Sequence, residues 1–258
     1  MEKAACRNIL KQYFLATILD ELMPGILHNF ANPLNGIMGR SALMQRRLQE
    51  HIDKMTSLHP HIAVEFREDY DKLTKDAALI NGEAETFSDL FWDVTNKFQG
   101  ISEEKERNID ISQLLAAEMK FANFFLNFKH DARKELSFQE ETFAVKGSQA
   151  DYSLCFFALI YRAMQALESV PTKEFSISTE NDRYDVIIRL RDTGEPVSAE
   201  KMQYINDLAL EKDDNVPYEF RDGMYYAALL LKYYAARLHI LRNANLNEVV
   251  ISIPHQRD

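Results

Sequence analysis

Apolar residues recur at steps of three and four positions along two long stretches in the first hundred residues. The first stretch runs from about 4 to 52 and is interrupted only by Pro24 and Pro33, and the second runs from about 66 to 98. This spacing gathers the apolar side chains on one face of a helix. Since a short segment around Pro60 separates the two stretches, the pattern predicts an antiparallel helical hairpin.

The apolar stripe on each predicted helix is wider than one neighbouring helix can cover. A second copy of the hairpin would complete the burial, as in a four-helix bundle. We therefore expect a homodimer that forms through residues of roughly 4 to 98.

Beyond the polar segment QGISEEKERN, short alternating runs mix with helical periods. Helices are predicted over 114–132, 150–170, 198–212 and 221–238, and strands over 109–113, 134–139, 142–148, 174–181, 183–194, 239–246 and 248–254. Helices mixed with mostly antiparallel strands favour an α+β sandwich. The predicted organisation is a helical hairpin at 1–100 followed by an α+β domain at 108–258.

Charge and cysteine content narrow the classes of function. A formal net charge of −10 disfavours nucleic acid and anionic membranes as partners, because both attract basic surfaces. The two cysteines, Cys6 and Cys155, are too few for a disulfide framework and lack metal-ligand spacing. No apolar run is long enough to span a bilayer. We expect a cytoplasmic protein that holds no metal.

The segment HNFANPLNGIMG at 28–39 places unusual residues within the first predicted helix. His28 and Asn32 are one turn apart and share a face. Pro33 has no N–H, so the carbonyl of Asn29 loses its helical donor and the helix can bend there. Taken alone, a histidine beside a proline is more often an ordinary surface residue than a site.

This segment resembles the H-box of bacterial sensor histidine kinases, and three later segments resemble the nucleotide boxes of the same family. FALIYRAMQAL resembles the N-box, RDTGEP the first glycine box, and RDGMYYAALLLKYYAARL the helix that follows the second glycine box. The resemblance covers nearly the whole chain. It implies a dimeric phosphoacceptor hairpin followed by the Bergerat, or GHKL, ATPase fold. It also implies that His28 accepts a phosphoryl group and that Asn32 positions the reacting groups or a water.

The N-box and the first glycine box depart from the family pattern. Arg162 stands where the family has an asparagine that ligates magnesium, and a guanidinium has no lone pair for a metal. Asp192, which in the family accepts from the adenine amino group, and Gly194 are retained. Pro196 replaces the second glycine of the box and removes a backbone donor.

The second glycine box departs further. Gly223 is retained, but Tyr225 and Ala227 occupy the other two glycine positions, where the family wraps triphosphate with backbone N–H groups. We therefore interpret Arg162, Asp192, Gly194 and Gly223 as a degenerate nucleotide site. Neither ATP nor Mg²⁺ is expected to bind, and any Mg²⁺ would belong to a partner receiver domain.

A retained phosphoacceptor beside a lost nucleotide site is similar to ChpT-like histidine phosphotransferases. The first hypothesis is a phosphotransfer protein, not an ATP-dependent kinase, that relays phosphoryl groups between receiver aspartates and takes them from a hybrid histidine kinase. Arg40, three turns after His28, would contact the receiver. The alternatives are a divergent ATP-dependent kinase core and a non-catalytic docking or inhibitory module.

Overall fold

The computed structural model describes residues 2–18, 23–57, 63–101, 105–140, 143–208 and 217–255. Backbone contacts divide the chain into two compact units. We call Pro24–Thr95 the hairpin unit, and Met1–Met23 together with Asn96–Asp258 the sandwich unit.

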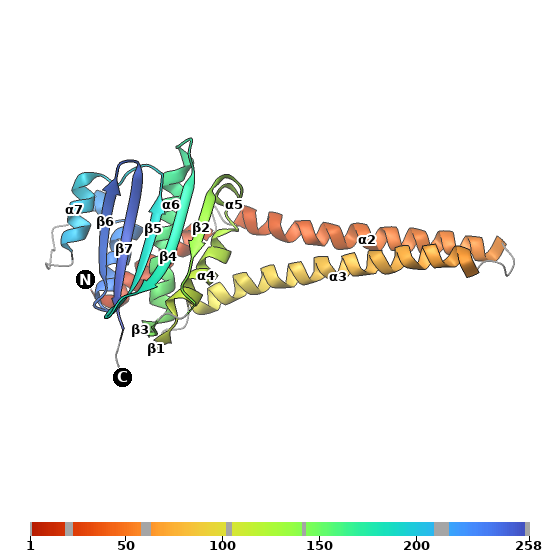
Figure 1. Cartoon of the computed structure of the whole chain (residues 1–258), viewed down its shortest axis with the longest axis horizontal. Coiled ribbons are helices and arrows are strands. Elements are labelled where there is room, and N and C mark those ends of the chain that lie inside the picture. The colour runs from red at the N-terminus through yellow and green to blue at the C-terminus, as the bar shows by residue number, and fades with distance from the viewer. Residues whose placement is uncertain are drawn as a thin grey trace. The chain divides into compact units, whose positions relative to one another are not determined.

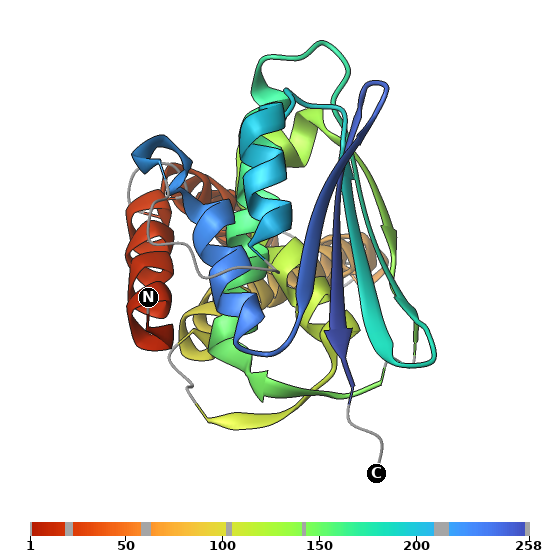
Figure 2. The same cartoon turned by 90° about the vertical axis from the view of Figure 1, so that its left-hand side faces the viewer.

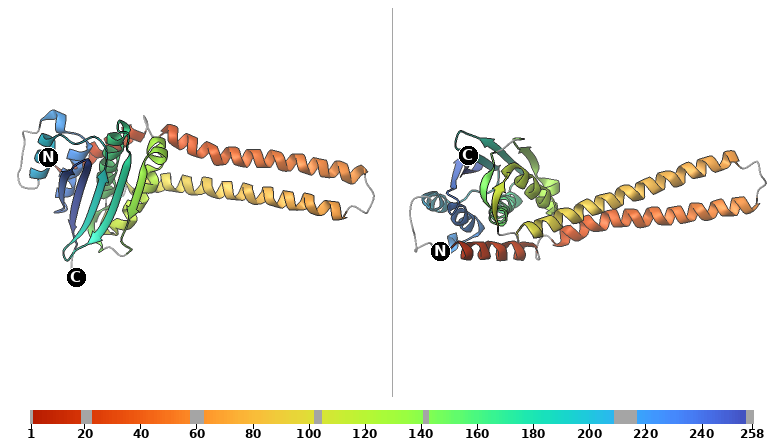
Figure 3. Two further views of the ribbon diagram at one scale, coloured as in Figure 1. Left: turned by 45° about the horizontal axis from the view of Figure 1, so that its top comes forward. Right: turned by 90° about the horizontal axis from the view of Figure 1, so that it is seen from below.

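The hairpin unit consists of two helices, α2 (Met23–Ser57) and α3 (Ala63–Gly100), which run side by side (Figures 1 and 3). The α2 helix continues through Pro33. Between the helices, Phe30 packs edge-on against Phe87 with ring centroids 5.3 Å apart. Arg47 forms an ion pair with Asp76, which is buried. The predicted helical hairpin is confirmed.

The sandwich unit is built on a five-stranded mixed sheet in the order β2-β4-β5-β7-β6. Its strands are β2 (Arg133–Ser137), β4 (Glu174–Asn181), β5 (Asp185–Asp192), β6 (Arg237–Asn243) and β7 (Leu246–Pro254). The β2 strand is parallel to β4, and the other neighbours are antiparallel. A separate antiparallel pair joins β1 (Glu106–Ile109) to β3 (Val145–Ser148).

Helices cover one face of the sheet (Figures 2 and 3). They are α4 (Ile111–Ala122), α5 (Leu126–Asp131), α6 (Gln149–Glu168), α7 (Ala199–Asp207) and α8 (Gly223–Lys232), with a 3₁₀ turn at Tyr218–Phe220. Alternate strand residues such as Ile177, Ile188 and Ile251 are fully buried beneath this layer. The predicted α+β class, a helical hairpin followed by a sandwich, is confirmed.

Three predicted elements end at different residues. The strand predicted over 109–113 is wrong beyond Ile109, because β1 spans Glu106–Ile109 and residues from Ile111 on belong to α4. Asp110 caps that helix by accepting from the Gln113 backbone N–H at 3.0 Å. The helix predicted over 114–132 is two helices, α4 and α5. The helix predicted over 221–238 ends at Lys232, and Ala235 follows in the left-handed region at φ 54°.

The first helix of the chain requires a larger correction. α1 (Lys3–Thr17) packs on α6 and α8 and belongs to the sandwich unit, so neither a helix over 4–52 nor a hairpin over 1–100 is correct. The apolar stripe of α1, which includes Cys6, Leu10 and Phe14, is buried within the sandwich unit. The sequence pattern showed the stripe but not which surface buries it.

The last turn of α3 is anchored in the sandwich unit by a buried charge. The Lys97 ammonium lies 2.6 Å from a Glu118 carboxylate oxygen on α4 and 2.8 Å from the Ser153 hydroxyl on α6. Burial lowers the pKa of Lys97, and the Glu118 carboxylate opposes that shift. Three phenylalanine rings surround the ammonium at 5.0–5.5 Å: Phe14, Phe121 and Phe157.

This ion pair generates a prediction about stability. Lys97→Met strands the Glu118 carboxylate in the core and should lower the free energy of unfolding by about 3–5 kcal/mol. Adding Glu118→Gln removes the stranded charge and should restore at least half of that loss. Lys72→Met, which removes an exposed pair with Glu68, is the control and should leave stability unchanged. Denaturant titration measures all three, and a Lys97→Met loss no larger than the control would contradict the anchor.

Candidate functional site

The predicted phosphoacceptor segment lies on α2 of the hairpin unit. His28 is part of this helix, but its side chain lies outside what the structure describes. Asn32, one turn later, is exposed, and Pro33 is buried. The two predicted residues therefore sit at the expected helical spacing, and the orientation of the imidazole stays a prediction.

Arg40 lies three turns beyond His28 on the same helix. Its guanidinium is 3.9 Å from the Asp76 carboxylate of α3, and 44% of its side chain is exposed. Arg47 binds the same carboxylate more closely. Arg40 thus retains exposed surface while Asp76 and Arg47 fix the two helices to each other.

In the sandwich unit, Asp192 stands at the end of β5 with partners on both oxygens. One oxygen accepts from the Asn247 amide at 2.7 Å and from the Gly194 backbone N–H at 2.9 Å. The other lies 3.2 Å from the Arg162 guanidinium of α6. Burial raises the pKa of Asp192, while Asn247, Arg162 and the Gly194 N–H oppose that shift. All three partners stabilise the charged carboxylate.

The Arg162 guanidinium bridges two parts of this cluster. Besides Asp192, it donates to the Glu195 backbone carbonyl at 2.7 Å. The Asn247 amide reaches the Gly194 carbonyl at 3.0 Å and the Glu195 carbonyl at 3.2 Å. Arg162, Asn247 and the turn after β5 thus form a closed hydrogen-bonded cluster around Asp192.

Gly194 is a glycine because the chain passes close to α6 there. A Cβ at this position would lie 2.5 Å from the backbone carbon of Ala166. The Glu195 N–H also donates to the Ala166 carbonyl at 2.9 Å. A close approach of the turn to α6 therefore explains this retained glycine, without any ligand.

The start of α8 is occupied by an acidic side chain. Asp222 caps the helix by accepting from the Tyr225 backbone N–H at 3.1 Å, and it forms an ion pair with Lys201 of α7. Unpaired N–H groups at a helix start favour an anion. Here a carboxylate of the chain supplies that negative charge.

The two residues that replace family glycines on α8 are part of the core. Tyr225 is 5% exposed and Ala227 is fully buried. The Tyr225 ring lies 5.1 Å from that of Tyr226 and 6.4 Å from that of Tyr204. The fourth predicted position, Gly223, lies against Tyr13 of α1.

The structure brings Arg162, Asp192 and Gly194 into one cluster, and Gly223 into a separate contact with α1. Sequence reasoning missed Asn247 and Tyr13, which complete these two sets. Neither belongs to a recognisable motif. Asn247 lies at the start of β7, opposite Asp192 in the β5–β7 register, and it closely follows turn residues among which asparagine is common for local reasons.

Other candidate chemistry is sparse within the described ranges. They contain no group of three or more metal-ligating side chains. Both cysteines are buried and free. His59 and His61, the two histidines of the segment LHPHI, lie outside the described residues. Among the helices that the structure describes, none combines the length and apolarity needed to cross a membrane.

Comparisons with known proteins found similarity in solved structures alone. No family model matches the chain. No curated protein matches it either.

Several solved structures resemble the chain. The histidine kinase AdeS of Acinetobacter baumannii is 17% identical with a TM-score of 0.45, over 84% of this chain and 96% of that one. A bacterial phosphotransferase is 12% identical with a TM-score of 0.40, over 89% and 93%. The histidine kinase ThkA, in complex with the response regulator TrrA, is 15% identical with a TM-score of 0.44, over 95% and 64%.

Identities and TM-scores at this level describe a likeness in fold and say nothing of activity. The chain's own architecture is a helical hairpin that precedes a mixed sheet covered on one face by helices. The closer likeness to ChpT-like phosphotransferases stays a prediction. The solved structures that resemble the chain include histidine kinases and a phosphotransferase, and this likeness is one of fold.

Proposed function

We propose that this protein is a histidine phosphotransferase that relays phosphoryl groups between receiver-domain aspartates through His28, without binding ATP. The observation that carries the proposal is the closed cluster around Asp192. The carboxylate expected to recognise adenine is engaged by Arg162, Asn247 and Gly194. A nucleotide would have to displace these internal partners.

The start of α8 supports the same proposal. The Asp222 carboxylate caps the N–H groups there, and Lys201 is paired with that carboxylate. A triphosphate approaching this end would meet a negative charge already in place. Tyr225 and Ala227 are packed within the core where glycines would leave room for phosphate.

Features of the hairpin also support the proposed relay. His28 lies on a two-helix scaffold fixed by the Arg47–Asp76 ion pair. Asn29, the next residue, is an amide and cannot act as the general base that autophosphorylation uses in many kinases. Exposed Asn32 stands one turn away and would orient the phosphoryl group or a water.

The chemical step balances without a nucleotide. An imidazole nitrogen of His28 attacks the phosphorus of a receiver aspartyl phosphate, and a P–N bond forms as the P–O bond breaks. The receiver carboxylate leaves, and the imidazole loses its proton to solvent. The reverse step passes the group to a second receiver. With an unperturbed pKa near 6.5, histidine is largely neutral and nucleophilic at neutral pH.

Homodimerisation is part of the proposal. The proposed dimer interface, predicted from the sequence over roughly 4 to 98, is now limited to α2 and α3. The hairpin unit exposes large apolar side chains that a second copy would cover: Leu34, Leu79, Phe91 and Trp92. Phe91 and Trp92 are half exposed and pack against each other at 6.3 Å. Such a set favours an interface.

The proposal first predicts that the protein does not bind ATP. Calorimetry with Mg-ATP should show no binding in the micromolar range, which would correspond to about −8 kcal/mol. Asp192→Asn weakens the internal Arg162 pair and should lower thermal stability without creating ATP affinity. A micromolar dissociation constant for the wild-type chain would overturn the proposal in favour of a divergent kinase.

The second prediction concerns assembly. Light scattering should give twice the chain mass of 29.9 kDa. Leu79→Asp combined with Phe91→Asp charges the exposed hairpin face and should give monomers. Leu136→Asp is the matched control because Leu136 is also half exposed but lies on β2 of the sandwich unit. A monomeric wild-type protein at micromolar concentration would contradict the proposed bundle.

The third prediction concerns the phosphoacceptor. A phosphorylated partner receiver should label the wild-type protein, and His28→Ala should abolish the label while the dimer persists. Asn32→Ala should slow transfer or hydrolysis but keep some label, because its role is orientation. His239→Ala, which removes an exposed histidine on β6, is the control and should label normally.

Two outcomes would contradict the assignment. Acid-labile label that survives in the His28→Ala protein would place the acceptor elsewhere. No label from a broad panel of receivers and kinases would instead favour a non-catalytic docking module.

A further inference from the structure

The α1 helix depends on the sandwich unit for its own stability. It is 15 residues long, and an isolated helix of about this length is marginal in water. One face is buried on α6 and α8, and Figure 2 shows α1 lying beside α8. The buried residues of α1 are Cys6, Leu10, Phe14 and Thr17.

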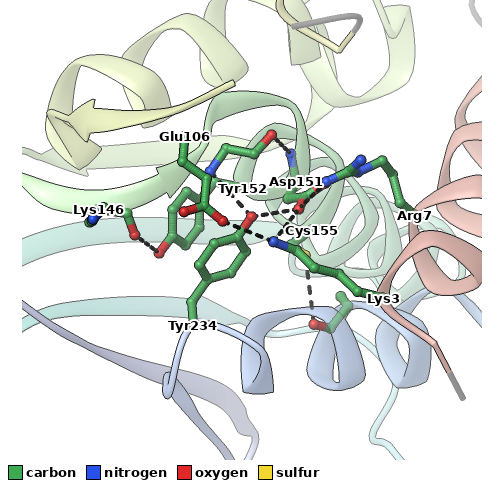
Figure 4. Close-up of polar contacts among 10 residues, drawn as sticks. Lys3, Arg7, Glu106, Lys146, Asp151, Tyr152, Cys155 and Tyr234 are labelled. Carbon is green, nitrogen blue, oxygen red and sulfur yellow. Dashed lines mark hydrogen bonds and ion pairs between the residues drawn. The ribbon is translucent and has the colours of Figure 1, made fainter. Parts of the chain in front are cut away.

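A buried carboxylate on α6 fixes the first turns of α1 (Figure 4). Asp151 is fully buried and accepts from the Arg7 guanidinium at 2.8 Å and from the Tyr234 hydroxyl at 2.5 Å. The Lys3 ammonium is 3.6 Å from the same carboxylate and 3.3 Å from Glu106. A buried charge is costly unless it is paired. Both cations that pair with Asp151 come from α1.

An aromatic contact fixes the other half of α1. The Tyr13 ring packs edge-on against Tyr161 of α6, with centroids 5.8 Å apart. It also lies over Gly223, where a Cβ would be 2.9 Å from a Tyr13 ring carbon and 3.3 Å from the Ala158 Cβ. A Cβ at 2.9 Å would force the Tyr13 ring to shift, so the ring as it lies here favours glycine beneath it.

The backbone of Gly223 gives no other reason for a glycine. None of the glycines that the structure describes has a positive φ. Gly223 is the first residue of α8, where an alanine would be accepted by the helix itself. The close approach of the Tyr13 ring of α1, with the Ala158 Cβ beside it, is therefore what disfavours a side chain at this position.

We propose that the outer surface of α6 and α8 is a docking site for an amphipathic helix with one basic and one aromatic anchor, and that its occupant is α1 of the same chain. Asp151 receives the basic anchor Arg7. Gly223 receives the aromatic anchor Tyr13, so this glycine serves helix docking and not phosphate binding. The proposal does not depend on phosphotransfer by His28.

Hydrogen exchange of the full-length protein tests the docking locally. Tyr13→Ala should accelerate exchange of the α1 amides roughly tenfold or more, while the β5 amides stay within about threefold of the wild type. Gln12→Ala changes the exposed face of α1 and is the matched control, with no effect expected. Equal acceleration of α1 and β5, or none in α1, would overturn the proposal.

A double-mutant cycle tests the role of Gly223. Gly223→Ala should reduce the folding equilibrium constant roughly tenfold in the wild-type background, and by less than about threefold when Tyr13→Ala removes the ring. Gly194→Ala is the control glycine, because its Cβ meets the Ala166 backbone and not α1. Its cost should be the same in both backgrounds.

The double-mutant cycle can either support or overturn the role proposed for Gly223. A Gly223→Ala cost that is undiminished by Tyr13→Ala would assign the glycine to something other than α1. If Gly223→Ala folds only when combined with Tyr13→Ala, the rescue supports the docking directly. If Gly223→Ala fails to fold both alone and in combination with Tyr13→Ala, the glycine does not owe its place to Tyr13, and that part of the proposal fails.

Discussion

The buried charge of Lys97 is the constraint around which the sandwich unit is assembled. An ammonium inside a core must be paired and hydrogen-bonded, which obliges Glu118 of α4 and Ser153 of α6 to meet it. The Phe14 ring of α1 lies 5.0 Å away and packs on Phe98, the neighbour of Lys97. One site thus joins the end of α3 to α1, α4 and α6.

The positions that resemble the nucleotide boxes share one physical feature, because the side chains there contact the protein itself. Arg162 and Asn247 hold the Asp192 carboxylate, Asp222 caps α8, and Tyr13 lies over Gly223. These internal contacts are the basis on which we propose that the domain does not bind ATP.

Much of this architecture could be predicted from the sequence because periodicity is a local property. The hairpin helices, the β4–β5 turn and the buried α6 follow from apolar spacing and turn residues. The position of α1 did not, because its stripe is the same whether a second copy or the sandwich unit buries it. The same limit applied at Asp192: the motif identified the residue, but its partner Asn247 lies 55 positions away without a motif.

The retained glycines also show what cannot be predicted from the sequence. A retained glycine in a family motif suggests retained ligand binding, yet Gly194 and Gly223 are explained by Ala166 and Tyr13. The sequence reveals that a side chain is absent, but only the structure reveals what fills the space. Both positions can therefore belong to a degenerate nucleotide site and still require glycine, because neighbouring protein atoms leave little room for a side chain.

We propose that phosphoryl groups reach His28 from receiver aspartates and not from ATP. Phosphorus NMR of the full-length protein tests it most directly, with a phosphorylated partner receiver in one sample and Mg-ATP alone in the other. We expect a phosphohistidine resonance with the receiver, its absence in His28→Ala, and no such resonance with ATP. A phosphohistidine signal that forms with ATP alone would contradict it.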